Sequence, residues 1–285
     1  MNPLLLSAPA KLNLSLRVLG KRADGFHEID TLMVKIPTLA DSIEFREAAE
    51  FRFSCDDPSV PSDAQNLVVK AVRAFETATG RSVHHEISLK KVIPHGAGLG
   101  GGSSDAATTL LGLNRLHAFP LGVETLHQIA ASLGSDIPFF LTSGPSRCTG
   151  RGELIEPAPA APSLPILLLK PAFSVATPDA YGRFLTSTKL PGISYAPQIV
   201  DGIPILNDLE IPVFGKHRFL AELKQWLLAR DETRAALMSG SGSTLFAILH
   251  AGTDAEKLAR CARHEIDPNL WHHCGQTEAE CRQSF

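Results

Sequence analysis

The chain has 285 residues, 44% of them hydrophobic and 20% charged, with a formal net charge of −3. This composition is typical of a soluble globular protein with one large or two medium domains. The chain has no excess of basic residues, so its composition does not indicate nucleic acid as a partner. The first residues lack the basic region and cleavage site of a signal peptide, and the apolar run at 166–169 is far too short to span a bilayer, so we expect no membrane association.

The five cysteines are odd in number and include no C-x-x-C pair. We therefore expect no disulfide framework and a cytoplasmic location. The C-terminal part also contains a group of possible zinc ligands: His264, His272, His273, Cys274 and Cys281. Their spacings match no usual zinc pattern, and the alternative is a C-terminal strand and turn in which they are incidental. We expect no protein metal site.

Alternating apolar and polar residues predict strands at 7–20, 29–36 and 42–53. Ser62 and Gln65 form a possible capping box for a helix that runs to Thr79 and ends at Gly80. A strand at 83–93 leads directly into a glycine-rich loop. Helices are predicted after it at 103–116 and 123–133, the second ending at Gly134.

Residues 156–165 contain four prolines and are the best candidate for a domain boundary. We therefore predict domains at 1–156 and 157–285. The second domain is predicted to contain strands at 166–170, 235–238 and 244–249, and helices at 178–185, 214–228 and 255–264. Strands dominate the start of the chain and the two element types mix later, which indicates an α+β protein in two halves.

The glycine-rich loop contains five glycines in seven residues, followed by two serines and the predicted helix. Glycine lets backbone N–H groups approach a ligand closely, and the N-terminus of a helix adds free N–H groups and a positive dipole end. Such a site binds phosphate. The candidate nucleotide-binding residues are Pro94, His95, Gly96, Ala97, Gly98, Leu99, Gly100, Gly101, Gly102, Ser103 and Ser104.

The loop also matches the G-x-G-x-x-G spacing of dinucleotide-binding proteins at Gly96, Gly98 and Gly101. That fingerprint requires a following strand that ends in an acidic residue, and none is predicted at that distance. A P-loop is excluded because no Gly-Lys-Ser/Thr ends the segment. A phosphate-binding loop without a lysine remains, with a flexible linker as the alternative.

Three other segments have two interpretations each. Lys11 and Asn13 face the same way on one strand, either as functional groups or as part of a solvated face. Asp136 either caps the next turn or acts as a base or charge partner at a cleft. The small-residue segment 238–244 is either an ordinary hairpin turn or a second wall of donors around a phosphate or substrate.

These segments, in this order, resemble the GHMP kinase superfamily. The glycine-rich loop resembles its nucleotide loop, and 239–243 resembles its C-terminal glycine motif. The segments 9–14 and 20–27 are more specific, and with 149–153 and 207–210 they resemble the members that phosphorylate 4-diphosphocytidyl-2-C-methyl-D-erythritol. The resemblance covers about 8–250.

The resemblance implies a two-domain GHMP kinase fold, with an N-terminal ribosomal-protein-S5-like α/β domain and a C-terminal α+β domain. It implies transfer of phosphate from ATP, with Mg²⁺, to the 2-hydroxyl of this small-molecule substrate in the non-mevalonate isoprenoid route. Lys11 and Asp136 match catalytic residues. The substrate-binding matches are Asn13, Phe26, His27 and, more loosely, Tyr181. Phe26 stands where tyrosine is common, which preserves the stacking area without the hydroxyl.

In this mechanism Asp136 accepts or orients the proton of the attacking hydroxyl, and Lys11 offsets charge on the transferring phosphoryl group. Mg²⁺ is expected on the phosphates, with Ser104 as a possible contact and Asp105 turned away or acting indirectly. Asn66 and Leu67 are candidates for the adenine side. The alternatives are a kinase of the homoserine or mevalonate type and a catalytically silent nucleotide-binding regulator. We expect a monomer or a homodimer.

Overall fold

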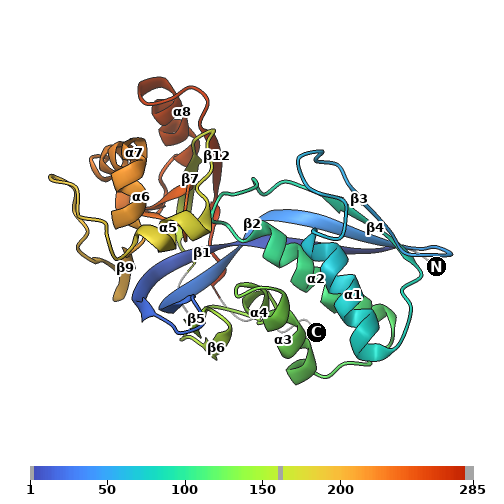
Figure 1. Ribbon diagram of the computed structural model, residues 1–285. Coiled ribbons are helices and arrows are strands. Elements are labelled where there is room, and N and C mark those ends of the chain that lie inside the picture. Colours follow the sequence, from blue (N-terminus) through green and yellow to red (C-terminus); the bar gives the residue numbers. More distant parts are fainter. Residues whose placement is uncertain (1–2, 160–162, 280–285) are drawn as a thin grey trace.

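Two long antiparallel strands, β1 (Leu4–Lys21) and β2 (His27–Glu47), extend through most of the molecule (Figure 1). The computed structural model describes residues 3–159 and 163–279. The separate strands predicted at 29–36 and 42–53 are wrong, because β2 continues through Pro37. Pro9 pairs with Ala40 and Ala10 with Ile36, so residues 37–39 form a bulge that accommodates the proline.

β1 and β2 lie at the centre of the first sheet, in the order β3-β4-β2-β1-β9-β8, with β5 attached to β2 and β6 to β5. The other strands are β3 (Arg52–Cys55), β4 (His85–Lys90), β5 (Ser146–Gly150), β6 (Leu154–Pro157), β8 (Gln198–Val200) and β9 (Ile203–Asn207). The strand predicted to continue to Phe53 ends instead at Glu47. The residues after it form the separate strand β3, which pairs in parallel with β4.

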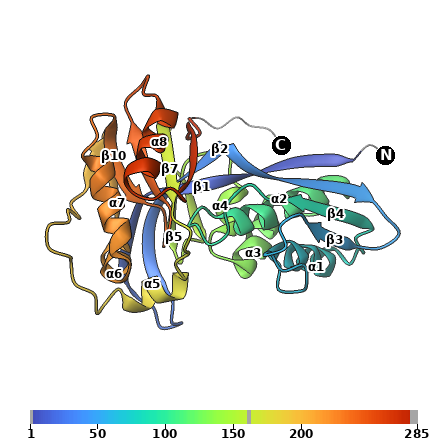
Figure 2. The same ribbon diagram turned by 90° about the horizontal axis from the view of Figure 1, so that it is seen from above.

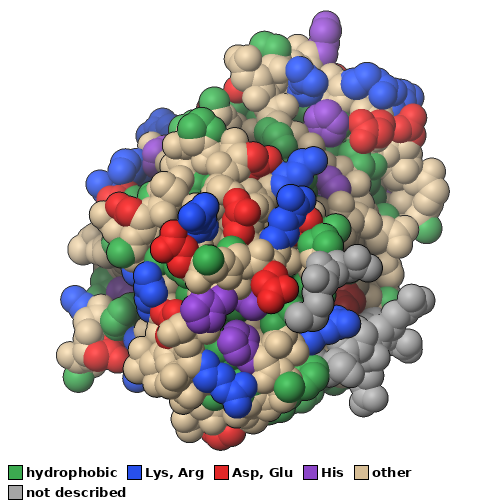
Figure 3. Space-filling view, turned by 90° about the vertical axis from the view of Figure 1, so that its right-hand side faces the viewer, with side chains coloured by type: hydrophobic (Ala, Val, Ile, Leu, Met, Phe, Trp, Pro, Cys, Tyr) green, Lys and Arg blue, Asp and Glu red, His purple; other side chains and the backbone are tan. Residues whose placement is uncertain are grey.

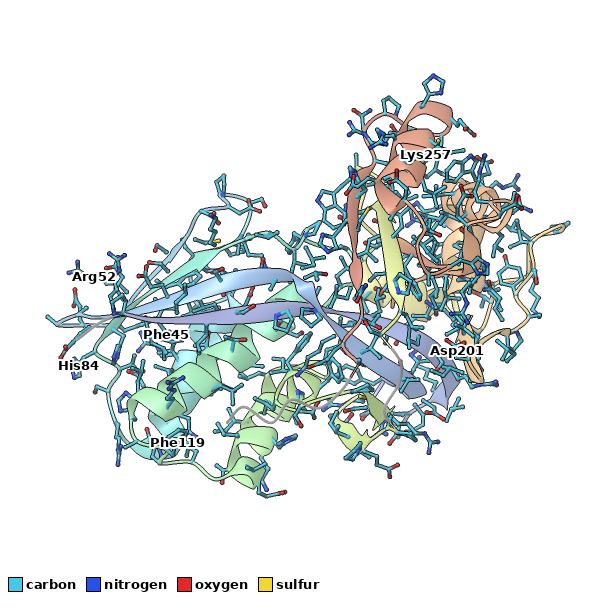
Figure 4. The ribbon with its side chains drawn as sticks, turned by 180° about the vertical axis from the view of Figure 1, so that it is seen from behind. Phe45, Arg52, His84, Phe119, Asp201 and Lys257 are labelled. Atoms are coloured by element: carbon cyan, nitrogen blue, oxygen red, sulfur yellow. The ribbon has the colours of Figure 1, made fainter. Side chains whose placement is uncertain are left out.

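Four helices lie along one side of β1 and β2 (Figure 1). They are α1 (Leu67–Thr79), α2 (Gly101–Leu116), α3 (Val123–Leu133) and α4 (Ile137–Phe140). The ring of Phe45 points from β2 toward α2, where it contacts the backbone of Gly112 (Figure 4). A Cβ at Gly112 would overlap this ring, so the glycine sets how closely α2 packs on the sheet.

The helix α1 begins later than its predicted capping box. Its cap is Asn66, whose Oδ1 accepts a hydrogen bond of 2.8 Å from the N–H of Val68. The Asn66 amide also donates to the carbonyl of Pro61 at 2.6 Å, which fixes the preceding loop and places the cap after Ser62 and Gln65. The predicted end at Gly80 is confirmed: this residue adopts a left-handed conformation with φ of +66°.

The second sheet has the order β10-β11-β7-β12 and lies on the other side of the molecule (Figure 2). Its strands are β7 (Pro165–Lys170), β10 (Thr233–Met238), β11 (Leu245–Leu249) and β12 (Trp271–Gln276). The helices of this half are α5 (Thr177–Arg183), α6 (Glu210–Lys216), α7 (Arg218–Leu228) and α8 (Ala255–Glu265). The single helix predicted at 214–228 is wrong, because His217 leaves the helical conformation with φ −120° and ψ 73° and separates α6 from α7.

The two halves are joined by more than the chain between them. β9 returns to the first sheet and pairs in parallel with β1 through Ser15 and Leu206. Asp208, directly after β9, accepts a hydrogen bond of 2.9 Å from the N–H of Val18. These contacts hold the second half against β1. The division at 156–157 stays a prediction.

On the face shown in Figure 3, basic and acidic side chains are interspersed. Within the described parts of the chain, no helix is long and apolar enough to cross a membrane. Residues 3–159 and 163–279 also contain no group of three or more His, Cys, Asp and Glu side chains placed to hold a metal ion. His272, His273 and Cys274 lie on β12, as the alternative to a zinc site expects, and Cys281 lies outside the described residues.

Candidate active site

A cavity of about 830 Å³ lies where the two halves meet. It is lined by residues of β1, the turn after β1, the glycine-rich loop, the turn before α4, the start of α5 and the loop between β10 and β11. Every predicted nucleotide-loop residue from Pro94 to Ser103 lines it. Ser104 does not, because its side chain is fully buried. The lining also includes all the other predicted site residues: Lys11, Asn13, Phe26, His27, Asp136 and Tyr181.

Lys11 and Asn13 are buried, so the alternative of a solvated strand face does not hold. The Lys11 ammonium donates to Asn13 Oδ1 at 2.6 Å, and Asn13 Nδ2 donates to Thr31 Oγ1 at 2.8 Å. The Thr31 hydroxyl then donates to the carbonyl of Ser15 at 2.6 Å. Because the hydroxyl uses its proton on Ser15, its oxygen accepts from the Asn13 amide. This sets the amide orientation and presents Oδ1 to Lys11.

Asp136 stands just before α4 and makes no side-chain cap for that helix. Its Oδ2 instead lies 3.4 Å from Nζ of Lys11, and one third of its side chain is exposed. The carboxylate is thus paired with a buried ammonium and open to the cavity. This geometry fits a base or charge partner at a cleft and does not fit a capping role.

The glycine-rich loop runs next to Lys11. The Lys11 N–H donates to the carbonyl of Leu99 at 2.9 Å. Gly98 and Gly100 have φ of +75° and +71°, in the region that favours glycine. A Cβ at Gly100 would lie 2.9 Å from Cγ of Lys11, so this close approach also requires the absence of a side chain. The helix α2 begins at Gly101, two residues earlier than predicted, and directs its N-terminus toward the cavity.

The loop between β10 and β11 packs directly on the glycine-rich loop. Ser239 Oγ donates to the carbonyl of Gly98 at 3.0 Å, and the Thr244 N–H donates to the carbonyl of Ala97 at 3.2 Å. Gly240, Ser241 and Gly242 line the cavity. The segment is therefore both a hairpin connection between antiparallel strands and a second wall of the site.

A buried group of charged residues lies next to the glycine-rich loop. Of this group, the sequence analysis considered only Asp105. Lys91 donates to carboxylate oxygens of both Asp41 and Asp105. Asp41 Oδ1 also accepts from the backbone N–H groups of Val92 and Ile93, just before the loop. Lys91 thus connects the strand end to the first turn of α2.

Burial raises the pKa of Asp105 to about 7, and the neighbouring carboxylate of Asp41 adds to this effect, despite the opposing effect of Lys91. Burial by itself would lower the pKa of Lys91, but the two carboxylates raise it above its ordinary value. The sequence contains no local signal for this group, because its two aspartates are distant from the lysine along the chain. Lys91 and Asp105 both line the cavity.

Aromatic side chains line another part of the cavity. The rings of His27 and Tyr181 lie 5.2 Å apart, inclined by 31°. Phe26 is half exposed, and the guanidinium of Arg151 lies 4.9 Å from the centre of its ring. Glu153 holds Arg151 by accepting from its backbone N–H at 2.6 Å and its Nε at 3.4 Å. Arg151 lies within the segment 149–153 that resembles the family, but its contact with Phe26 was not predicted.

Tyr181 lies deeper than Phe26. Burial, and then the charge of Asp136, raise the pKa of its phenol above the ordinary value, so the hydroxyl stays neutral at physiological pH. Asn66 and Leu67 also line the cavity, on the side of α1. Two hydrogen bonds of the Asn66 side chain, one that caps α1 and one to Pro61, fix its place in this wall.

Comparison with known proteins agrees with this geometry. The model of the GHMP kinase N-terminal domain matches residues 66–144, and that of the GHMP kinase C-terminal domain matches 201–266. A 4-diphosphocytidyl-2-C-methyl-D-erythritol kinase from Methylacidiphilum infernorum is 43% identical over 275 residues, covering 93% of each chain. The enzyme of that name from Geobacter sp. is 39% identical, covering 94% of this chain and 95% of its own.

Solved structures give the same result. A crystal structure of 4-(cytidine 5′-diphospho)-2C-methyl-D-erythritol kinase superposes with a TM-score of 0.79 at 33% identity, covering 97% of this chain and 100% of the other. A homoserine kinase from Cytophaga hutchinsonii, with a TM-score of 0.68 at 19% identity, covers 99% of this chain and 96% of its own and shares the fold. These comparisons confirm the predicted two-domain GHMP kinase fold, and the chain belongs to the 4-diphosphocytidyl-2-C-methyl-D-erythritol kinase family of the GHMP kinases.

Proposed function

We propose that this chain transfers the γ-phosphoryl group of ATP to the 2-hydroxyl of 4-diphosphocytidyl-2-C-methyl-D-erythritol. The observation that carries the proposal is the 3.4 Å contact between Lys11 and Asp136, in one cavity that is also lined by the glycine-rich loop and by aromatic rings. The family membership supplies the identity of the substrate. The four described cysteines are free thiols, which supports a cytoplasmic location.

The glycine-rich loop and the N-terminus of α2 bind the phosphates of ATP in this proposal. Backbone N–H groups and the helix dipole favour anions there without a loop lysine. Lys91 offsets the charge of Asp105, which would otherwise repel the nucleotide from the first turn of the helix. Leu67 and the neighbouring wall of α1 border this part of the cavity and remain candidates for the adenine side.

Asp136 and Lys11 act on the reacting groups. Asp136 accepts or orients the proton of the attacking 2-hydroxyl, and its partly exposed carboxylate leaves room for that contact. Lys11 offsets the charge that spreads over the transferring phosphoryl group. Asn13 holds the ammonium in place by accepting one of its hydrogen bonds.

Phe26, His27 and Tyr181 bind the cytidylyl part of the substrate. The exposed ring of Phe26 offers a stacking face for cytosine. The contact between the rings of His27 and Tyr181 forms one wall of the same pocket. Arg151, seated on Phe26, adds a positive charge beside the diphosphate-bearing substrate. The side chains in this part of the cavity thus suit a planar base joined to an anion.

We also expect Mg²⁺ to bind with the phosphates of ATP. The hydroxyl of Ser104 is fully buried in the first turn of α2 and has no hydrogen-bond partner among the described residues. Mg²⁺ prefers oxygen ligands and needs few from the protein. Ser104 does not line the cavity, however, so the ion would be held by phosphate oxygens and water, and it would offset phosphate charge.

Release of ADP by the purified protein tests this function. The assay compares ATP alone with ATP plus 4-diphosphocytidyl-2-C-methyl-D-erythritol, homoserine or mevalonate. We expect turnover with the cytidylyl substrate only, and a product phosphorylated at the 2-hydroxyl. Turnover with homoserine or mevalonate would instead assign another small-molecule kinase activity, and binding of ATP without turnover on any substrate would indicate a regulator.

A further inference from the structure

Asn207 lies at the end of β9, outside the cavity lining, and is nearly fully buried. Its Nδ2 donates two hydrogen bonds of 2.7 Å, one to the carbonyl of Met238 and one to that of Gly240. Its Oδ1 accepts from the N–H of Leu209 at 2.9 Å. The side chain thus uses both amide protons to hold the start of the loop between β10 and β11.

This contact determines which way one peptide group of the loop faces. In a trans peptide the C=O and the following N–H point in opposite directions. Because the carbonyl of Gly240 points at Asn207, the N–H of Ser241 points away from it. Ser241 lines the cavity, and within the described residues its N–H has no protein acceptor.

Gly240, which supplies the carbonyl of this peptide group, lies beside the reacting groups. A Cβ added to Gly240 would be 3.3 Å from Nζ of Lys11 and 3.2 Å from Oδ1 of Asn13. Ser241 follows directly and lines the same cavity as Lys11, so its N–H and the Lys11 ammonium can contact one small anion there. A reversed peptide would present the carbonyl oxygen there and repel such an anion.

Neighbours on both sides fix the position of Asn207. Asp208 is tied to β1 through the N–H of Val18, and Glu210 accepts from the N–H of Met238 at 3.0 Å. Glu210 is in turn paired with Lys224 at 2.6 Å. The segment therefore relates β1, which holds Lys11, to β10, which leads into the loop.

We propose that Asn207 is a positioning residue for phosphoryl transfer: it turns the N–H of Ser241 toward the transferring phosphoryl group. This inference rests on the proposed function. Asn207 touches neither substrate nor nucleotide and acts through the loop. A donor placed where charge develops in the transition state affects kcat more than substrate binding.

The first test replaces Asn207 by Asp and by Ala. Asp keeps the shape and the acceptor for Leu209 but lacks both donors, and Ala removes the contacts without adding charge. The matched control is Asn114→Asp, because Asn114 is an equally buried asparagine that donates to Leu121 O and accepts from Leu121 N at 3.0 Å each, far from the loop. All assays are run below the unfolding transition of every variant.

We expect both Asn207 variants to lose about 10- to 100-fold in kcat, as for a misplaced oxyanion donor, with KM for the cytidylyl substrate changed by less than about threefold. The Asn114 variant should lose stability and keep its kcat. Retention of kcat within about threefold in both Asn207 variants, or an equal loss in the control, would overturn the inference.

The second test needs no turnover. In the ¹⁵N-labelled protein, the amide signal of Ser241 should shift when an imido analogue of ATP is added with Mg²⁺, and should not shift in Asn207→Asp. An unmoved signal in the unmodified protein contradicts the role of Asn207. If the unmodified protein fails to phosphorylate the cytidylyl substrate, the proposed function is wrong, while the amide measurement separately shows whether Asn207 directs the N–H of Ser241 to bound phosphate.

Discussion

Nζ of Lys11 lies 3.4 Å from Oδ2 of Asp136, although the two residues come from opposite ends of the first half of the chain. The central strand β1 supplies the lysine and the turn before α4 supplies the carboxylate. The lysine is also held by Asn13, so its position is fixed from two sides.

Asp136→Asn should lower kcat by at least about 100-fold, because the amide cannot accept the proton of the attacking hydroxyl. Binding of ATP should be nearly unchanged, since the glycine-rich loop is not altered. Steady-state kinetics and calorimetric titration with ATP measure the two effects. Asp201→Asn, an exposed change beside Arg234, is the control and should keep full activity. Activity within a few-fold of the unmodified protein would remove Asp136 from the chemistry.

Phe26→Ala should raise KM for the cytidylyl substrate by about tenfold while kcat changes less, because ring stacking contributes about 1–3 kcal/mol per base to binding. The ring is half exposed, so its removal should cost little stability. Phe119→Ala removes a similarly exposed ring that does not line the cavity, and serves as the control. An unchanged KM in the Phe26 variant would contradict the assignment of the cytidine site.

Gly98→Ala should raise KM for ATP by about tenfold or more, since a Cβ is strained at the left-handed φ of +75°. That Cβ would also overlap the carbonyl of Ser239 and lie 2.9 Å from the carbonyl of Gly242. The two loops would have to separate. Gly192→Ala has a similar φ of +78° but open space around its Cβ, so it reports the backbone cost alone. Equal kinetic effects of the two substitutions would show that loop contact is unimportant.

Asp105→Asn should change how stability depends on pH. The pKa of Asp105 is about 7 in the folded protein against an ordinary value of 3.8, so the folded state binds the proton more tightly. Its contribution to stability is fully present below pH 3.8 and is lost as the pH rises through 7. Asparagine does not ionise.

The free energy of unfolding of Asp105→Asn, relative to the unmodified protein, should therefore rise between pH 5 and pH 8. Urea denaturation at several pH values in this range measures it. The pKa of Asp201 is lowered by its hydrogen bond to Arg234, so Asp201→Asn should show no such rise. A difference for Asp105→Asn that stays constant with pH would rule out titration of this carboxylate in the range.

Much of the architecture follows from local patterns. The period-two alternation of β1 predicts that Lys11 and Asn13 share a face, and the run of glycines before an Ala- and Leu-rich segment predicts a phosphate site at a helix start. Short elements such as α4, β8 and β9 were not predicted. They are stabilised by contacts with distant parts of the chain, as in the pairing of β9 with β1, and not by their own periodicity.

The amino-acid sequence by itself determined the kind of chemistry: a phosphate-binding loop, a lysine, an aspartate and aromatic residues in an order typical of one kinase family. Only the tertiary structure decided how these residues are held. Residues from different elements are joined by the ion pairs of Lys91, by the contact of Arg151 with the ring of Phe26 and by the hydrogen bond of Asn207 to Gly240. Local spacing records backbone periodicity, whereas such contacts depend on how the sheets and helices pack, and this is where the position of each reacting group is set.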